Sequence, residues 1–310
     1  MNIEDQIVTP IQEIGKFKEN KLWIKREDLI PFSFGGNKAR KARLFFQQID
    51  EGSYDCVVTY GSGSSNHCRV TANECSRRGI ECFIVSPEDT FNASFNSQMT
   101  SIFGAEITTV SVNEVHNTIE NKLTNLIKIG RRPYFIEGGG HGNIGTEAYV
   151  QCYDEIKKQE KEMGVFFDCI FFASGTGTTQ AGLICGQLQV GDVRQIIGVS
   201  IARKNPRGRN VVIQSIHDYL RERADEESIQ KATIFIDEYT SGYGQYDKRV
   251  VETIKNVLMS YGIPLDATYT GKAFMGMTEY ISNQKVEGKN ILFIHTGGTP
   301  LFFDSLVKNH

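Results

Sequence analysis

Short apolar segments that alternate with longer, mixed segments constrain the fold of this 310-residue chain more than any other feature. The longer segments have the length of helices. Short apolar strands that alternate with helices are typical of a parallel sheet covered on both faces. The expected strands are Leu22–Lys25, Cys56–Tyr60, Cys82–Val85, Glu106–Val110, Tyr134–Ile136, Cys169–Ala173, Ile196–Ser200, Thr233–Ile236 and Ile291–Ile294.

The length and the two series of strands predict two domains in close contact. We expect an α/β fold with two open, twisted, parallel-type sheets and helices on both faces. The alternation restarts near residue 140, so the predicted division is discontinuous: residues 1–47 with 140–310 form a large domain, and residues 48–139 form a small βα domain. Open α/β sheets bind ligands at the carboxyl ends of their strands, which places the expected active site in the cleft between the domains.

Composition excludes several classes of protein. A net charge of −3 and a charged fraction of 23% argue against a dedicated nucleic-acid-binding protein. The acidic N-terminus lacks the apolar segment of a secretory signal, and no apolar run approaches the roughly 18 residues of a membrane span. The seven cysteines include no Cys-x-x-Cys pair, so we expect buried thiols in a reducing cytoplasm, without a metal site or disulfides.

The segment Phe34–Lys41 has a diglycine turn, then Asn37, and places Lys38 in the first turn of an expected helix. Asn37 is the expected N-cap. Because a helix dipole opposes a positive charge at its N-terminus by roughly 0.3–1 kcal/mol, Lys38 is tilted modestly toward its neutral, nucleophilic amine. Taken alone, the segment is better explained as a solvated basic face. We keep that interpretation for three neighbours of Lys38, namely Arg40, Lys41 and Arg43.

The loop Ser174–Gln180 follows an apolar strand and precedes a helix. Its glycines, its hydroxyl groups and the helix N-terminus together can wrap an oxyanion. Gln180 stands where a dinucleotide-binding loop has its third glycine, and no Lys-Ser/Thr pair follows, which argues against both common nucleotide loops. We therefore expect a single phosphate monoester here, with a plain strand–helix turn as the alternative.

Three further loops are expected at the same cleft. Gly61–His67 would point hydroxyl and amide groups into it, although Ser65 could serve only as a helix N-cap. His295, at a strand end, is more simply explained as a structural histidine than as a base. The tyrosines of Tyr239–Tyr246 and Tyr269 could be apolar walls or hydrogen-bond donors.

A phosphate cradle, a lysine at a helix start and hydroxyl-rich loops together indicate pyridoxal 5'-phosphate, whose aldehyde forms a Schiff base with lysine and whose ring accepts electrons. Five motifs, in the expected order, resemble those of the D-cysteine desulfhydrase and 1-aminocyclopropane-1-carboxylate deaminase family, within the tryptophan-synthase-β-like (fold type II) pyridoxal phosphate enzymes. The resemblance spans about residues 22–303 and rests on Gly35–Lys41, Ser65–His67, Thr176–Gly182, Tyr269–Ala273 and His295–Gly298.

The resemblance implies a role for each matching residue. Lys38 would bind the cofactor covalently, Asn66 would contact the ring 3-hydroxyl, and Thr296 would face the pyridine nitrogen. The residues implied to cradle the phosphate are Gly175, Thr176, Gly177, Thr178 and Thr179. The residues implied in catalysis besides Lys38 are Ser65, Tyr243 and Tyr269, and those implied to contact the substrate are Ser65, Asn66, His67, Tyr243 and Tyr269.

Two positions favour the desulfhydrase branch of the family. Deaminases of the cyclopropane substrate carry Glu after the tyrosine that Tyr269 matches and Leu between the His and the Gly-Gly, where this chain has Thr270 and Thr296. The resemblance therefore implies α,β-elimination from a small D-amino acid such as D-cysteine, giving pyruvate, ammonia and sulfide. Lys38, or Ser65 assisted by it, would remove the α-proton. Homodimers are usual in the family, so we expect a homodimer.

The segment Glu137–Glu147 departs from the family pattern, because His141 and Gly142 replace a serine and an asparagine. His141 is a candidate substrate contact or second base at the domain junction, and a loop substitution without consequence is the alternative. Two other functions stay open: a racemase or β-replacement enzyme that uses the same cofactor on another small amino acid, and a cofactor-binding homologue without turnover.

Overall fold

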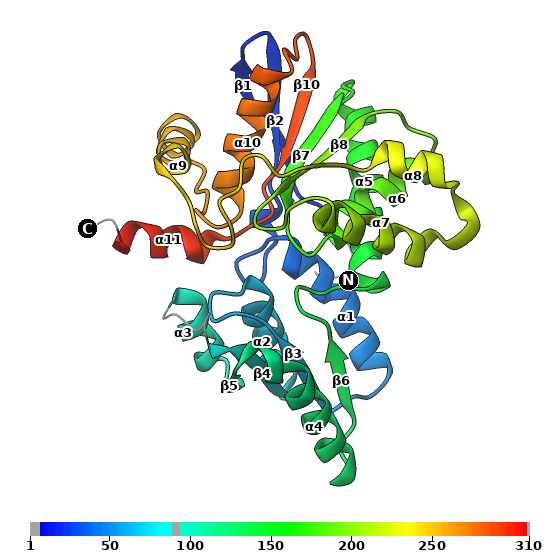
Figure 1. Ribbon diagram of the computed structural model, residues 1–310, viewed down its shortest axis with the longest axis vertical. Helices are drawn as coiled ribbons and strands as arrows, with labels where there is room; N and C mark the ends of the chain where they lie inside the picture. Colours follow the sequence, from blue (N-terminus) through cyan, green and yellow to red (C-terminus); the bar gives the residue numbers. More distant parts are fainter. Residues whose placement is uncertain (1–6, 89–93, 309–310) are drawn as a thin grey trace.

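The computed structural model describes residues 7–88 and 94–308, in which the strands form two separate sheets (Figure 1). The strands are β1 (Ile11–Phe17), β2 (Asn20–Lys25), β3 (Cys56–Tyr60), β4 (Glu81–Pro87), β5 (Glu106–Val110), β6 (Pro133–Ile136), β7 (Cys169–Ser174), β8 (Gln195–Ser200), β9 (Ile234–Ile236) and β10 (Asn290–Ile294). The α-helices are α1 (Asn37–Glu51), α2 (Asn66–Arg78), α3 (Phe95–Ile102), α4 (Val115–Lys128), α5 (Asn143–Met163), α6 (Thr178–Gln189), α7 (Arg207–Leu220), α8 (Glu226–Ala232), α9 (Lys248–Tyr261), α10 (Thr270–Asn283) and α11 (Thr299–Lys308). Short 3-10 helices are η1 (Glu27–Leu29), η3 (Val112–Glu114) and η4 (Arg221–Arg223).

Helices cover both faces of the six-stranded sheet, whose order is β1-β2-β10-β7-β8-β9. Helices α9 and α10 pack on one face, and α5 to α8 pack on the other. The central strands β10, β7 and β8 are parallel and buried on both faces, which explains their continuous apolar sequences. At the edge, β1 pairs antiparallel with β2, so this sheet is mostly but not wholly parallel.

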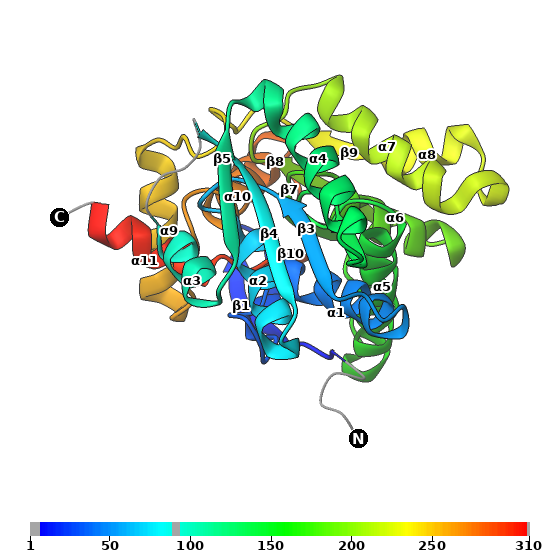
Figure 2. The same ribbon diagram turned by 90° about the horizontal axis from the view of Figure 1, so that it is seen from below.

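The four-stranded sheet has the order β5-β4-β3-β6 and is parallel throughout. Figure 2 shows its strands β5, β4 and β3 side by side. Helices α1 and α2 cover one face and α4 covers the other. Its strands β3 and β4 are therefore buried on both sides, and the α/β architecture with two helix-covered sheets is confirmed.

Helix α1 belongs to both halves of the molecule. Its apolar side chains Phe45, Phe46 and Ile49 are buried in the core of the small sheet. Its first turns pack against α5 of the large sheet, where Arg40 forms an ion pair with Glu155. The expected boundary between residues 47 and 48 falls inside this helix, and the division into domains stays a prediction.

All nine expected strands are present, with ends within two residues of the predicted ones. Among the strands and α-helices of the described residues, three were not predicted: β1, α8 and α11. All seven cysteines are free and buried, as expected. Within the two described ranges, 7–88 and 94–308, no helix is long and apolar enough to cross a membrane. The same residues contain no cluster of His, Cys, Asp and Glu that could hold a metal ion.

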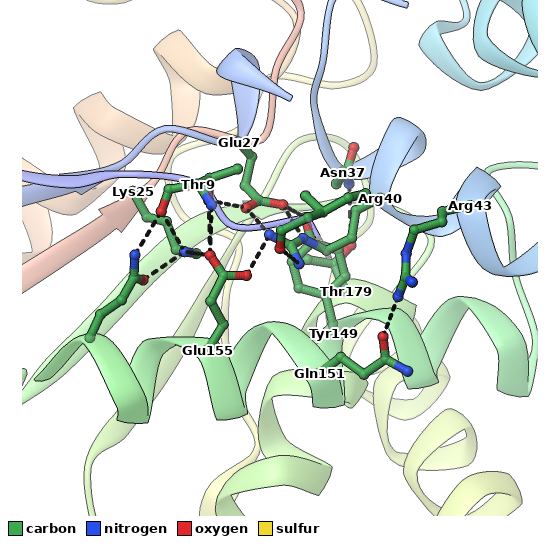
Figure 3. Close-up of polar contacts among 12 residues, drawn as sticks. Thr9, Lys25, Glu27, Asn37, Arg40, Arg43, Tyr149, Gln151, Glu155 and Thr179 are labelled. Atoms are coloured by element: carbon green, nitrogen blue, oxygen red, sulfur yellow. Dashed lines mark hydrogen bonds and ion pairs between the residues drawn. The ribbon is translucent and has the colours of Figure 1, made fainter. Parts of the chain in front are cut away.

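A buried network of charges ties the N-terminal segment to α1 and α5 (Figure 3). Arg40 Nε and Nη2 each donate at 2.6 Å to a carboxylate oxygen of Glu27, and Nη2 lies 2.8 Å from Glu155 Oε2. Lys25 Nζ donates to Glu155 Oε1 and to the Thr9 carbonyl. Burial opposes ionisation of Glu27, but Arg40 and Lys25 lower the pKa of this carboxyl to about 2. The prediction that Arg40 lies on a solvated face is wrong, because two carboxylates pair with it in the interior.

Candidate functional site

A cavity of about 380 Å³ lies where the carboxyl ends of strands from both sheets meet. Residues that end or directly follow β3, β4, β7 and β8 line it, which is where open α/β sheets bind ligands. The predicted site residues in its wall are Lys38, Ser65, Asn66, His67, Gly175, Thr176, Gly177, Thr179, Tyr243, Tyr269 and Thr296. The structure thus brings together residues that lie far apart in the sequence.

The backbone before Lys38 adopts an uncommon conformation. Four consecutive residues, Ser33 to Gly36, have positive φ angles of 47°, 55°, 61° and 93°. A Cβ at Gly36 would lie 2.7 Å from the Thr296 carbonyl oxygen, so only glycine permits this close approach. Gly36 is the N-cap of α1, and the prediction of Asn37 as N-cap is wrong, because its amide donates to Thr179 Oγ1 instead.

The amino group of Lys38 reaches the cavity and has one hydrogen-bond acceptor. Nζ donates to the Gly139 carbonyl oxygen at 2.8 Å, and no carboxylate in the described part of the chain pairs with it. Burial lowers the pKa of Lys38 to about 8, so about a tenth of this amine is neutral at pH 7. The direction agrees with the sequence-based expectation, but its cause is burial rather than the helix dipole.

A second lysine, Lys41, lies one turn further along α1 and is also buried. Its Nζ donates to Thr178 Oγ1 at 2.6 Å, at the first residue of α6. Burial, with the charge of Lys38, holds the pKa of Lys41 well below its usual value. The prediction that Lys41 is solvated is wrong, because α1 is covered by the small sheet and by α5. Arg43 is half-buried and donates to Gln151.

The loop Ser174–Gln180 has the features of an anion site. Gly177, with φ of 101°, begins α6, and no side chain caps this helix. The first backbone N–H groups of α6 therefore have no intrahelical acceptor and can bind an oxyanion. Gln180 has a structural role: its Oε1 accepts from Ser174 Oγ at 3.0 Å, and its Nε2 donates to the Ile234 carbonyl at 2.7 Å. These residues fit a phosphate monoester.

Two residues at the start of α2 present polar atoms to the cavity. Ser65 also caps the helix, because its Oγ accepts a hydrogen bond from the first turn. His67 Nε2 lies 2.8 Å from Thr59 Oγ1, whose own proton is donated to Ile136 O. His67 is therefore the donor in this pair, and its Nδ1 is left as an acceptor. Burial, with the charges of the nearby lysines, lowers the pKa of His67 to about 3, so the ring is neutral.

Tyr243 and Tyr269 form a hydrogen-bonded pair at the cavity, with 2.8 Å between their hydroxyl oxygens. The Tyr243 hydroxyl also lies 3.1 Å from Ser62 Oγ, in the loop that follows β3 of the small sheet. Burial, with the neighbouring Tyr243, holds the pKa of Tyr269 well above its usual value, so its hydroxyl stays protonated. The two tyrosines are therefore polar groups of the site as well as parts of its wall.

His295 is a structural residue, as the sequence suggested. Its Nε2 donates to the Pro264 carbonyl at 2.8 Å, and its Nδ1 accepts from the backbone N–H of Gly297 at 3.2 Å. With both ring nitrogens occupied, the imidazole orients the following residue. That residue, Thr296, lines the cavity.

Two of the predicted site residues are not in the cavity wall. Thr178 lies beside it and accepts from Lys41. His141 lies next to the backbone of Thr176, in the Ser174–Gln180 loop. Burial lowers the pKa of His141, the nearby basic groups lower it further, and Glu137 opposes this shift.

The structure also adds residues to the site. Tyr60 and Arg203 line the cavity, and Arg203 Nη1 donates to the Gly175 carbonyl at 2.7 Å. Both stand at or just beyond strand ends, which is the signal by which the sequence could have revealed them. Lys41 had a signal too, because its spacing of three from Lys38 places both lysines on one face of a helix.

The charge of the site follows from these positions. Among the described residues, no Asp or Glu lines the cavity, whereas Lys38 and Arg203 do and Lys41 lies beneath it. An uncompensated buried cation is costly, so the arrangement favours a ligand with negative groups. A neutral fraction of Lys38 can act there as a nucleophile or base.

Comparisons with known proteins agree with this chemistry. Residues 4–297 match the family model described as "Pyridoxal-phosphate dependent enzyme". The chain is 31% identical over 306 residues to a D-cysteine desulfhydrase of Yersinia pestis (strain Pestoides F), and 29% identical over 306 residues to a D-cysteine desulfhydrase of Serratia proteamaculans (strain 568). Each alignment covers 95% of this chain and 92% of the relative. A crystal structure described as an ACC deaminase homologue has a TM-score of 0.84 at 30% identity, over 98% of this chain and 94% of the other.

Proposed function

Because the chain belongs to the family of pyridoxal-phosphate-dependent enzymes, we propose that it catalyses α,β-elimination on a small D-amino acid of the D-cysteine type. D-cysteine and water would give pyruvate, ammonia and sulfide. The observation that carries this proposal is the pair of lysines at a cavity that no described Asp or Glu lines, combined with full-length similarity to D-cysteine desulfhydrases.

The residues divide into a phosphate part and a ring part. The phosphate would be held by the N-terminus of α6 together with Gly175, Thr176, Gly177 and Thr179. Lys41, which donates to Thr178 Oγ1, would supply a positive charge beneath the phosphate. Lys38 would bind the aldehyde carbon, Asn66 the ring hydroxyl and Thr296 the ring nitrogen. When bound, the cofactor withdraws electrons from the α-carbon of an amino acid joined to it.

The remaining groups would act on the substrate. The Lys38 amine, with its lowered pKa, can accept the α-proton, and Ser65 Oγ lies at the helix start where the substrate carboxylate would be bound. Tyr243 and Tyr269 would face the β-substituent, and since their mutual hydrogen bond uses one of the two hydroxyl protons, the other can be donated in a hydrogen bond to the departing thiolate. His67 is proposed as a substrate contact, whereas His141, outside the cavity wall, would act indirectly by positioning the loop at Thr176.

We also propose how the whole protein is organised. The active site lies in the cleft between a large domain (residues 1–47 and 140–310) and a small one (48–139). The protein works in the cytoplasm as a homodimer. An apolar groove formed by Phe34, Phe95, Met99, Pro300, Phe303 and Leu306 supports self-association. Light scattering at micromolar concentration should give twice the chain mass of 34.8 kDa, and a monomer would contradict this part.

The proposed reaction is tested with purified protein loaded with pyridoxal phosphate. We expect a visible absorbance band that Lys38→Ala abolishes, and release of pyruvate and sulfide from D-cysteine in equal amounts. L-cysteine and 1-aminocyclopropane-1-carboxylate should react at least ten times more slowly. A coloured protein that only racemises or substitutes its amino acids, or that converts none of them, would contradict elimination and support one of the other two functions.

A further inference from the structure

The side-chain amide of Asn66, at the start of α2, is held in one orientation by a neighbour on α3. Asn96 Nδ2 donates to the Ser64 carbonyl oxygen at 2.8 Å and to Asn66 Oδ1 at 2.9 Å. Because a backbone carbonyl can only accept, Asn96 must turn its NH2 group toward Ser64. Asn66 must then turn its oxygen, and not its own NH2 group, toward Asn96.

Arg69, one turn along α2, imposes the same orientation. Its Nη2 lies 3.4 Å from Asn66 Oδ1, and a guanidinium can only donate. Its Nη1 donates to the carbonyl of Ser33, and the guanidinium lies over the ring of Phe34 at 5.4 Å. Arg69 therefore also joins α2 to the loop that leads to Lys38.

With its oxygen occupied twice, Asn66 has only its NH2 group left. Asn66 lines the cavity, and Nδ2 has no acceptor in the described part of the chain. The amide thus presents two N–H donors to whatever occupies the cavity.

Arg69 differs from Arg40, the buried arginine of the network in Figure 3. Arg40 pairs with two carboxylates, whereas Arg69 is completely buried and has no carboxylate partner among the described residues. Its Nε has no hydrogen-bond partner either. A nearby negative charge offsets the free-energy cost of burying a cation. Arg69 therefore favours a negatively charged ligand atom on the cavity side of the Asn66 amide.

We propose that Asn96 and Arg69 are positioning residues that hold the Asn66 amide with its NH2 group toward the cavity. In this orientation Asn66 donates to the ring oxygen of pyridoxal phosphate, and Arg69 stabilises the negative charge of that oxygen. The proposal rests on the proposed function, because it concerns the binding of that cofactor. It extends the site to a helix, α3, that contributes no residue to the cavity wall.

The test uses two substitutions of Asn96 with opposite consequences. Asn96→Asp keeps the shape but offers only acceptors, so the Asn66 amide turns over and presents its oxygen to the ring oxygen, while the new carboxylate neutralises Arg69. Asn96→Ala removes one donor and leaves Arg69 to hold Asn66. We expect pyridoxal phosphate to bind the apo-protein at least tenfold more weakly in Asn96→Asp than in the unchanged protein. Asn96→Ala should show a smaller loss, and the visible absorbance maximum of Asn96→Asp should shift.

A purely structural role of Asn96 predicts instead that affinity falls in step with stability and that the absorbance maximum stays unchanged, because both substitutions remove the hydrogen bond to the Ser64 carbonyl. Asn125→Asp makes the same chemical change at an exposed position of α4 and should change neither binding nor absorbance. Thermal unfolding of the apo-proteins checks that all variants fold. If Asn96→Asp binds and absorbs like the unchanged protein, the lock is wrong and the proposed function stands. If the unchanged protein binds no pyridoxal phosphate, both are wrong.

Discussion

Arg40 and Lys41 are adjacent in the sequence and both buried, yet different groups compensate their charges. Arg40 has Glu27 and Glu155 within ion-pair distance, and lies in the network of Figure 3. Lys41 has no carboxylate partner among the described residues: its Nζ donates to the Thr178 hydroxyl, at the N-terminus of α6, and lies 5.9 Å from the centre of the Tyr149 ring. Because an isolated buried cation costs free energy, the empty protein gains no stability from Lys41, and we propose that its partner is a ligand phosphate.

Replacing Lys41 by methionine should therefore affect stability and binding in opposite directions. The apo-protein should unfold at a higher temperature, since a desolvated charge is removed. Pyridoxal phosphate should bind roughly 10–100 times more weakly, as expected for the loss of a charged hydrogen-bonding group worth about 1.5–3 kcal/mol. Thermal unfolding and a cofactor titration measure both effects. Unchanged affinity in Lys41→Met would show that the lysine does not serve the phosphate.

The pH dependence of the apo-protein should reveal Lys38. Burial lowers its pKa from 10.5 in the unfolded chain to about 8 in the folded one. Below pH 8 both states are protonated and the penalty is complete. Between pH 8 and 10.5 only the unfolded state keeps the proton, so stability rises with pH. Urea unfolding should show Lys38→Met more stable than the unchanged apo-protein at pH 7, and this difference should shrink toward pH 10.5. A constant difference would contradict the lowered pKa.

Individual residues were predictable from the sequence where a motif fixes a local geometry. Lys38 after two glycines and Ser65 at a helix start are examples, and both line the cavity. The burial of Lys41 and Arg69 was not predictable, because it depends on helices that pack on them from distant parts of the chain. A periodic pattern shows which face a charged residue occupies, but not whether that face is later covered.

At the scale of elements, the position of α6 depends on how closely it approaches α5. A Cβ at Gly182 would lie 2.3 Å from the Thr146 carbonyl oxygen and 2.5 Å from Tyr149 Cβ. Neither the backbone atom nor the tyrosine stem can move independently of its helix. The N-terminus of α6 forms part of the cavity, so this contact positions the anion site as well as the core.

Gly182→Ala should therefore destabilise the protein by about 1–3 kcal/mol through overpacking, even though alanine is the better helix former by about 1 kcal/mol. Pyridoxal phosphate affinity should fall with it, because the two helices separate. Gln189→Ala, at the exposed end of the same helix, is the matched control and should change stability by less than about 0.5 kcal/mol. An unchanged urea midpoint in Gly182→Ala would mean that the helices can separate without cost.

The elements that the sequence predicted are those with a strong period and a buried surface, such as β3, β7 and β10. The sequence did not reveal β1, because this edge strand is polar, is interrupted by Gly15 and is half exposed. Helix α8 was missed because its seven residues define little periodicity.

At the scale of the whole molecule, helix α1 and the buried network behind it join the N-terminal elements to α5, in the middle of the chain. Lys25 on β2, Glu27 on η1 and Arg40 on α1 meet Tyr149 and Glu155 on α5. This network attaches α1 to the half of the molecule that contains the large sheet. Helix α1 in turn carries Lys38 and Lys41 and packs on the small sheet. The arrangement of the two halves therefore depends on charges that only the folded state brings together.

Acid should weaken this arrangement through Glu27, whose pKa is lowered from 4.5 to about 2 by Arg40 against the effect of burial. A carboxyl group with a lowered pKa contributes stability above its unfolded value, and this contribution is lost as the pH falls from 4.5 toward 2. Glu27→Gln should thus cost about 3 kcal/mol at pH 7, because Arg40 loses a buried partner, and progressively less below pH 4.5. Asp50→Asn makes the same change in the exposed pair with Arg78 and should cost no more than about 1 kcal/mol at any pH. Urea unfolding of the unchanged protein and both variants between pH 3 and 7 measures these differences. If the loss of unfolding free energy in Glu27→Gln stays constant over this range, the network is not the acid-sensitive contact between the two halves.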